Sequence, residues 1–145
     1  MQVGRIIDAP AEPVWTLLTD TSHWTLWGPS VAAVSSTERH IQRGTTGKIQ
    51  TAAGFWVPFT VTEFDEGSYW CWHVGGVRAT GHRLESLREN QCLLIFEVPF
   101  WAAPYLLVCK VALDRIERLA TGSELTAASC GNTADRSSGQ WNREV

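Results

Sequence analysis

Long hydrophobic runs are missing from this chain of 145 residues. No apolar stretch reaches the roughly 18–20 residues that a membrane-spanning helix needs. The first eight residues hold one arginine, an acid and no long apolar segment, unlike a signal peptide. We therefore expect a cytoplasmic protein without a transmembrane segment.

Positive charge and paired cysteines are also scarce. The formal net charge is −3, and no run of Lys or Arg would form a patch for nucleic acid or for anionic lipid. The sequence therefore argues against a nucleic-acid partner. The cysteines show no Cys-x-x-Cys spacing, which predicts free thiols in a reducing compartment; they are Cys71, Cys92, Cys109 and Cys130.

Several common signatures of catalysis are absent. There is no Gly-x-Ser-x-Gly elbow, no phosphate-binding loop and no dinucleotide fingerprint, so the sequence predicts no cofactor. His73 and His82 alternate to opposite strand faces, and no acidic residue lies at ligand spacing, which argues against a metal site.

Tryptophan, in contrast, is abundant, with 8 in the chain. Trp70 and Trp72 stand two residues apart, in line with Val74, and a Gly75-Gly76 turn follows. Alternate residues of a strand point to the same face, and each indole carries on the order of 150–250 Å² of surface. These side chains therefore predict a broad aromatic wall that either fills a core or lines a cavity.

The spacing of apolar residues predicts one domain over residues 1–121, of α+β class, and a flexible tail over residues 122–145. A strand over 3–7 is followed by two short helices, the second ended by Gly28-Pro29. A long helix is expected from about Ala102 to Ala120. Between the helices, period-two alternation predicts strands at 31–38, 46–53, 56–65, 68–75, 78–88 and 91–98.

Short turns join these strands, so we expect one curved antiparallel sheet of seven strands. The long amphipathic helix would lie in its concave face, with the two short helices at one margin. A sheet wrapped around a single helix leaves space beneath that helix, open at one end. This space is where a ligand would bind.

Three segments carry a family resemblance: Ile7–Trp15 (IDAPAEPVW), Trp24–Ser30 (WTLWGPS) and Pro58–Phe64 (PFTVTEF). The chain resembles the polyketide cyclase/dehydrase group of the START-like, helix-grip superfamily (SRPBCC) over about residues 1–120. That superfamily includes lipid carriers, plant hormone receptors and aromatase/cyclases. The resemblance implies a helix-grip fold with a cavity more firmly than it implies a reaction.

Alternation along the strands and the long helix selects the side chains that should face the cavity. We predict a lining formed by Trp27, Trp56, Phe59, Val61, Trp70, Trp72, Thr80, His82, Leu84, Leu94, Phe96, Tyr105 and Cys109.

His82 and Glu63 are the polar candidates for chemistry in this cavity. Arg83 and Glu85 belong in water, which turns His82 inward, and Glu63 follows Phe59 and Val61 inward. His82 is either a partner or acid/base for a ligand oxygen, or a core histidine bonded to a carbonyl or water. Glu63 is either a buried acid/base or a solvated carboxylate at the strand end.

Three functions remain open at this stage. The first is binding of a small hydrophobic or aromatic molecule in a cavity on the order of 300–1,000 Å³. The second is an aromatase/cyclase-type enzyme that uses His82 or Glu63 to move a proton. The third is a protein-interaction module with exposed tryptophans, which a homodimer burying Trp56 or Trp24 would favour.

Overall fold

The computed structural model describes residues 1–122, and the tail predicted for 122–145 lies outside that range but for its first residue. Seven strands form one antiparallel sheet in the order β1-β7-β6-β5-β4-β3-β2. They are β1 (Gln2–Ile7), β2 (Val31–Ser36), β3 (Thr46–Thr51), β4 (Trp56–Asp65), β5 (Tyr69–Val74), β6 (Val77–Arg88) and β7 (Gln91–Glu97). The predicted strand positions are confirmed to within a few residues.

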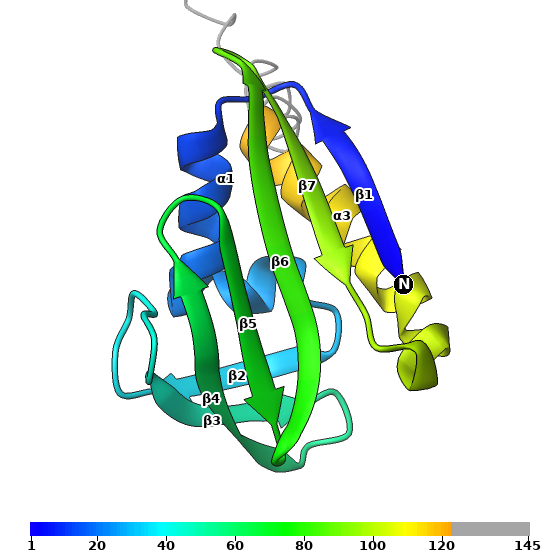
Figure 1. Cartoon of the computed structure of the whole chain (residues 1–145). Coiled ribbons are helices and arrows are strands. Elements are labelled where there is room, and N and C mark those ends of the chain that lie inside the picture. The colour runs from blue at the N-terminus through cyan, green and yellow to red at the C-terminus, as the bar shows by residue number, and fades with distance from the viewer. Residues whose placement is uncertain (123–145) are drawn as a thin grey trace, which may run out of the picture.

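The helices all lie on one side of this sheet. They are α1 (Ala11–Thr19), the 3₁₀ turn η1 (Thr21–His23), α2 (Trp24–Trp27), the 3₁₀ helix η2 (Phe100–Tyr105) and α3 (Leu106–Thr121). In Figure 1, α1 and α3 lie behind the strands, while β2 and β3 run across the lower end of the sheet, which is therefore strongly curved. This is the predicted α+β helix-grip architecture with a long C-terminal helix.

The final helix differs from the prediction in how it begins. A continuous helix was expected from Ala102, but residues 100–105 form η2, and α3 begins only at Leu106. Ala102 has φ −104° and ψ 27°, outside helical values, and Pro104 follows within the same turn. Because proline has no amide hydrogen to donate, this segment forms a 3₁₀ helix, and regular α-helical hydrogen bonds begin only in α3.

Two strand irregularities decide which side chains face inward. In the β4–β5 pair, Val61 lies opposite Trp72 but Glu63 lies opposite Cys71, so the register shifts by one residue. A second shift lies in the β5–β6 pair between Cys71 and His73. Such a bulge reverses the alternation of side chains beyond it.

The centre of the core is aromatic. Trp24 of α2 inserts between the sheet and α3 and stacks on Trp70, with ring centroids 5.5 Å apart and planes 4° from parallel. Trp72 meets Trp24 edge-on at 5.3 Å, and Phe59 lies 5.5 Å from Trp24. Trp24 also donates its indole hydrogen to the Leu18 carbonyl at 2.9 Å. The short helix α2 is thus fixed by the side chain that it buries.

Salt bridges link the edge strand β1 to α3. Arg5 of β1 approaches Asp114 at 3.1 Å and Glu117 at 3.2 Å.

Within residues 1–122, no helix is long and apolar enough to cross a membrane.

Candidate functional site

Two adjoining hollows lie between the sheet and the helices. The deep hollow has a volume of about 30 Å³ and lies under α3, against Trp24, Trp27, Trp70 and His82. The outer cavity has a volume of about 460 Å³ and lies at the open end of the fold. Both are lined by Ser30, Val31, Trp72, Thr80 and Tyr105, so the two spaces share part of their walls.

The deep hollow is small because indoles fill the space that an open cavity would need. Trp24, Trp70 and Trp72 pack against one another with centroids 5.3–5.6 Å apart. About 30 Å³ is room for a water molecule, or for one small group of a larger ligand. The space beneath the long helix is therefore narrow at this depth, where Trp24 of α2 lies against Trp70 and Trp72.

The outer cavity is large enough for a small molecule. Its walls come from the β3–β4 and β5–β6 hairpins, from the loop before β2 and from η2. Apolar residues dominate, among them Ile49, Val74, Val77, Val98, Trp101 and Ala102. Within the described part of the chain, Arg78 is the single charged residue of the lining. A volume of about 460 Å³ is in the range of small-molecule sites.

A chain of hydrogen bonds joins the floor of the outer cavity to the deep hollow. Trp72 Nε1 donates to Thr80 Oγ1 at 3.1 Å, and Thr80 Oγ1 lies 3.3 Å from His82 Nε2. The imidazole of His82 stacks on the indole of Trp70 at 3.9 Å and meets Phe96 edge-on at 4.9 Å. His82 is thus held by a stacked indole, by the Phe96 ring and at one nitrogen.

Burial decides the protonation of His82. The residue is 2% exposed, and this burial lowers its pKa to about 3, although the backbone of Trp70 opposes the shift. The imidazole is therefore neutral near pH 7 and can orient a ligand by hydrogen bonding. Protonated His82, the form that would act as a general acid, is scarce at that pH.

A second polar pair stands at the boundary between the two hollows. Ser30 Oγ and Tyr105 Oη are 2.7 Å apart, which ties the loop before β2 to the end of η2. Burial raises the pKa of Tyr105, although the bond from Ser30 partly offsets this. Burial also raises the pKa of Cys109 to about 11, so that side chain is a thiol. Neither group is ionised near pH 7.

Glu63 does not face the cavity, which corrects its predicted orientation. The bulge after Val61 turns Glu63 to the outer face of the sheet, where its side chain is 48% exposed and lies 4.0 Å from Arg78. Phe64 faces inward instead, with its ring 5.8 Å from that of Trp15. The structure therefore separates Glu63 from His82.

The remaining predicted lining residues fall into three groups. Trp27, Phe96, Tyr105 and Cys109 line the deep hollow with the indoles of β5. Trp56 is half exposed and lies outside the lining of both hollows. The remaining predicted positions are buried in the core but line neither hollow, and they are Phe59, Val61, Leu84 and Leu94.

Sequence reasoning missed several residues of the outer cavity. Ser30 stands in the loop after α2 and Trp101 in η2, where strand alternation gives no information, and Val77 is the first residue of β6. One signal was available: residues 98–109 contain no charged side chain. Phe100 and Trp101 of this segment are 82% and 61% exposed.

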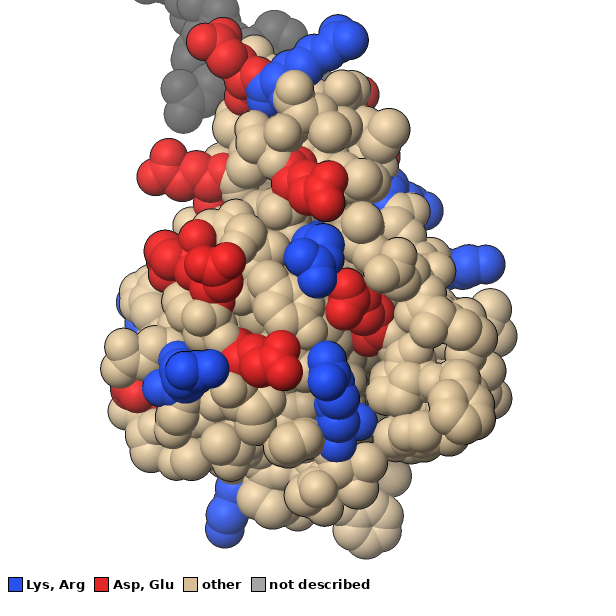
Figure 2. All heavy atoms as spheres, in the orientation of Figure 1, with Lys and Arg blue, Asp and Glu red and all other residues tan. Residues whose placement is uncertain are grey.

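The outer face of the sheet has a different character. Figure 2 shows acidic and basic side chains interspersed along it, while the lobe at the lower right, where η2 lies in Figure 1, carries none. On the outer face of the sheet, Arg83 Nε lies 3.1 Å from Glu97 Oε1. The face of the sheet seen in Figure 2 thus carries charges of both signs.

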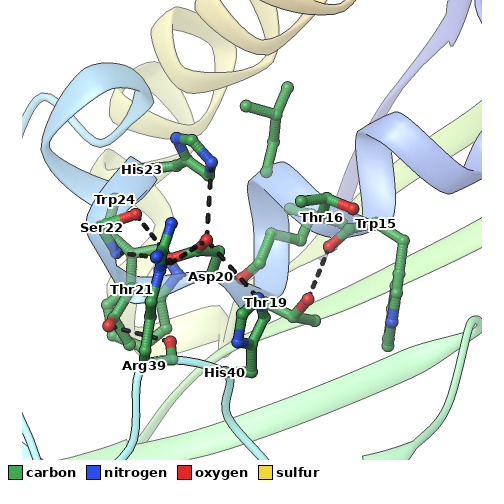
Figure 3. Close-up of polar contacts among 12 residues, drawn as sticks. Trp15, Thr16, Thr19, Asp20, Thr21, Ser22, His23, Trp24, Arg39 and His40 are labelled. Atoms are coloured by element: carbon green, nitrogen blue, oxygen red, sulfur yellow. Dashed lines mark hydrogen bonds and ion pairs between the residues drawn. The ribbon is translucent and has the colours of Figure 1, made fainter.

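A separate polar cluster surrounds Asp20, at the junction of α1 and η1 (Figure 3). The carboxylate accepts bonds from the Ser22 amide at 2.9 Å, the Ser22 hydroxyl at 2.6 Å and Arg39 Nε at 3.1 Å. His23 and His40 each place Nε2 3.6 Å from Asp20 Oδ2. The cluster pins the β2–β3 loop to η1, and it shares no residue with the linings of the two hollows.

Comparisons with known proteins agree with this architecture. The family model described as "Polyketide cyclase / dehydrase and lipid transport" matches residues 1–100. A comparison with curated proteins found no significant match.

Solved structures resemble the chain at low sequence identity. The Zhui aromatase/cyclase from a Streptomyces species is 14% identical, with a TM-score of 0.64 over 83% of this chain and 92% of its own. XoxI from Bacillus cereus is 14% identical, with a TM-score of 0.66 over 86% and 96%. An AHSA1-like protein from Aeromonas hydrophila is 15% identical, with a TM-score of 0.59 over 86% and 95%. These likenesses establish the fold.

Proposed function

Since the chain belongs to the polyketide cyclase / dehydrase and lipid transport family, we propose that it binds a small hydrophobic molecule in the outer cavity. The observation that carries the proposal is the apolar space of about 460 Å³ between the hairpins and η2. Burial of apolar ligand surface there would supply most of the affinity. Trp72, Val74 and Trp101 would form the contact surface.

The positions of the titratable groups favour binding over proton transfer. His82 is buried and neutral, and Glu63 lies on the opposite face of the sheet. A cyclase-type reaction uses a group that exchanges protons near the working pH, and neither His82 nor Glu63 lines the outer cavity. An aromatase/cyclase activity therefore ranks second.

One of the two tryptophans expected at a protein-interaction surface is not accessible. Trp24 is buried in the core and is closed to a partner, whereas Trp56 is half exposed. A homodimer through Trp56 and a cytoplasmic location stay predictions.

Native mass spectrometry of the freshly purified full chain tests the proposal directly, because a bound hydrophobic molecule would appear as added mass. Titration with N-phenyl-1-naphthylamine, a neutral fluorescent probe, provides the second measurement. We expect saturable binding that Val74→Phe weakens, because the larger ring takes up part of the cavity. Ala32→Phe is the matched control, because Ala32 is exposed on β2 and lies outside both linings.

Two results would contradict the proposal. One is the absence of both added mass and saturable probe binding. The other is equal loss of binding in Val74→Phe and Ala32→Phe, which would show that the probe senses general stability and not the cavity.

A further inference from the structure

The outward face of α3 changes character halfway along the helix. Leu107, Val111, Asp114 and Arg118 follow one another at spacings of three or four residues, so they form one stripe of the helix surface. The second half of this stripe is polar, and Arg118 Nη2 lies 3.0 Å from Asp114 Oδ2. The first half is apolar, yet Leu107 and Val111 are 68% and 44% exposed. A helix face in water is normally polar, so the first half requires an explanation.

The turn before α3 extends this apolar surface. Phe100 and Trp101 belong to η2, which leads directly into α3, and they are 82% and 61% exposed. Figure 2 shows no charged side chain on the lobe where η2 lies. We use the term apolar patch for four exposed side chains of η2 and the first half of α3: Phe100, Trp101, Leu107 and Val111. Exposed apolar side chains that gather in one place mark an interaction site, whereas scattered ones do not.

The size of the apolar patch fits the centre of a protein interface. Its four side chains expose on the order of 500 Å², which is near the upper end for the largest patch of a monomer. A stable interface buries about 800 Å² on each partner. Its centre is rich in aromatic residues and poor in charge, and its rim is polar. The patch would supply such a centre, and Lys110, which is exposed beside Val111, would belong to the rim.

The distribution of charge favours a second copy of the chain as the partner. In a two-fold dimer each patch meets an identical patch, so a patch of one charge sign would face its own sign and be repelled. Residues 98–113 contain one charged side chain, Lys110, and no acid. The acids responsible for the net charge of −3 therefore lie outside this segment. Two apolar patches can meet without electrostatic repulsion at the contact.

A membrane surface matches this face less well. Helices that lie on membranes carry many Lys and Arg residues beside their apolar side, and anionic lipid attracts them. The polar half of α3 has both signs of charge, and its Asp114 and Glu117 lie 3.1 and 3.2 Å from Arg5. With a net charge of −3, the chain has no overall attraction to anionic lipid. A second copy is therefore the better partner for the patch.

We propose that the apolar patch is the contact surface of a homodimer. In this dimer, η2 and the first half of α3 of one copy pack against the same segment of the second copy, and the polar half of each α3 stays in water. An interface of this size is compatible with a dissociation constant on the order of micromolar. The contact is distinct from the dimer through Trp56, and it does not depend on the presence of a ligand in the outer cavity.

Sedimentation velocity of the full chain tests the proposal over concentrations from about 1 to about 500 µM, which bracket a micromolar dissociation constant. We expect a concentration-dependent dimer in the wild type. Leu107→Glu places a negative charge in both patches and should raise the dissociation constant at least about tenfold. Folding should be preserved, because Leu107 is exposed and a glutamate suits the first turn of a helix. An unchanged Tm of the variant checks this.

Two further variants locate the contact. Phe100→Ser removes the most exposed aromatic ring of the patch without adding charge, and it should also weaken the dimer. Leu87→Glu is the matched control, because Leu87 is 44% exposed and lies near the β6–β7 turn, at the other end of the sheet from η2 (Figure 1). Its dissociation constant should equal that of the wild type. None of these three residues lines either hollow, so the ligand site stays intact.

Several results would overturn the proposal. One is a wild type that stays monomeric at every concentration. Another is equal weakening by Leu107→Glu and Leu87→Glu, since added negative charge alone would then explain the loss. A dimer that survives Leu107→Glu but not Trp56→Glu would place the contact on β4. Flotation of a monomeric wild type with phosphatidylcholine vesicles, abolished by Leu107→Glu, would show that the patch faces lipid.

Discussion

Asp20 shows how one buried charge can organise two segments that lie far apart in the sequence. Burial by itself would raise its pKa, but hydrogen bonds from Ser22 and Arg39 and the charge of Arg39 outweigh burial and lower the pKa to about 2. An ordinary aspartate titrates near 3.8. The charged carboxylate therefore stabilises the folded state above that pH, and this contribution is lost as the pH falls toward 2.

We predict that Asp20→Asn lowers the free energy of unfolding at pH 7 by about 2 kcal/mol. The deficit relative to the wild type should shrink as the pH falls from about 4 to about 2, since the wild-type carboxylate then takes up a proton. Urea denaturation at pH 7, 4 and 3 measures both quantities. A deficit that stays constant over this range would contradict the assignment.

His82, unlike Asp20, is a basic group, and its titration affects the stability of the fold over a different pH range. Its folded pKa of about 3 lies below the ordinary value of 6.5, so between these values the unfolded chain binds a proton that the folded chain excludes. We predict that wild-type stability falls as the pH drops from about 6.5 toward 3. His82→Phe, which keeps a ring against Trp70, should show a shallower fall between pH 7 and pH 5 in calorimetry. His73→Gln should follow the wild type.

At the scale of elements, the β4 bulge explains where the sequence prediction of the site stopped. Period-two alternation located β4 correctly and placed Phe59 and Val61 inward. It then sent Glu63 inward as well, because nothing in the alternation marks an extra residue. A cue existed in Phe64, an aromatic residue three positions after Val61, which breaks the pattern of a uniform strand.

The contact between β3 and β4 depends on a glycine. A Cβ at Gly47 would meet the Ser35 carbonyl oxygen and lie 2.8 Å from the Phe59 ring. We predict that Gly47→Ala lowers the free energy of unfolding by about 2–3 kcal/mol, measured by urea denaturation. Gly4→Ala is the control on β1, where the nearest atom is a flexible Ile95 side-chain carbon at 3.2 Å. Similar losses in both variants would contradict this reasoning.

For the whole molecule, the resemblance and the strand spacing together predicted the seven-stranded sheet and its long helix. The interior was harder to predict, because a helix of four residues decides it. Whether Trp24 of α2 lies inside the fold or at its margin depends on the orientation of that helix, which local spacing does not encode. The position of the cavity followed from that single insertion.

The described residues form a closed core, and this leads to a prediction about the rest of the chain. Gly122 ends α3 with a φ of 71°, and Leu113 and Ile116 of that helix are buried against the sheet. We expect removal of residues 123–145, which are rich in Ser, Thr, Gly and Ala, to change Tm by less than about 2 °C. A drop of many degrees in differential scanning calorimetry would show that this segment contributes to the fold.

Because Trp24 fills the centre of the fold, the residues that stabilise the core differ from those that would contact a ligand. The stacked rings at the centre stabilise the fold, while a ligand in the outer cavity would touch η2, the β3–β4 turn at Ala52 and Ala53, and the start of β6 at Val77. Randomising these positions would therefore explore new specificities while the interior stays untouched. Because these positions lie outside the core, mutations there would change the ligand preference in small steps, each at little cost to folding stability.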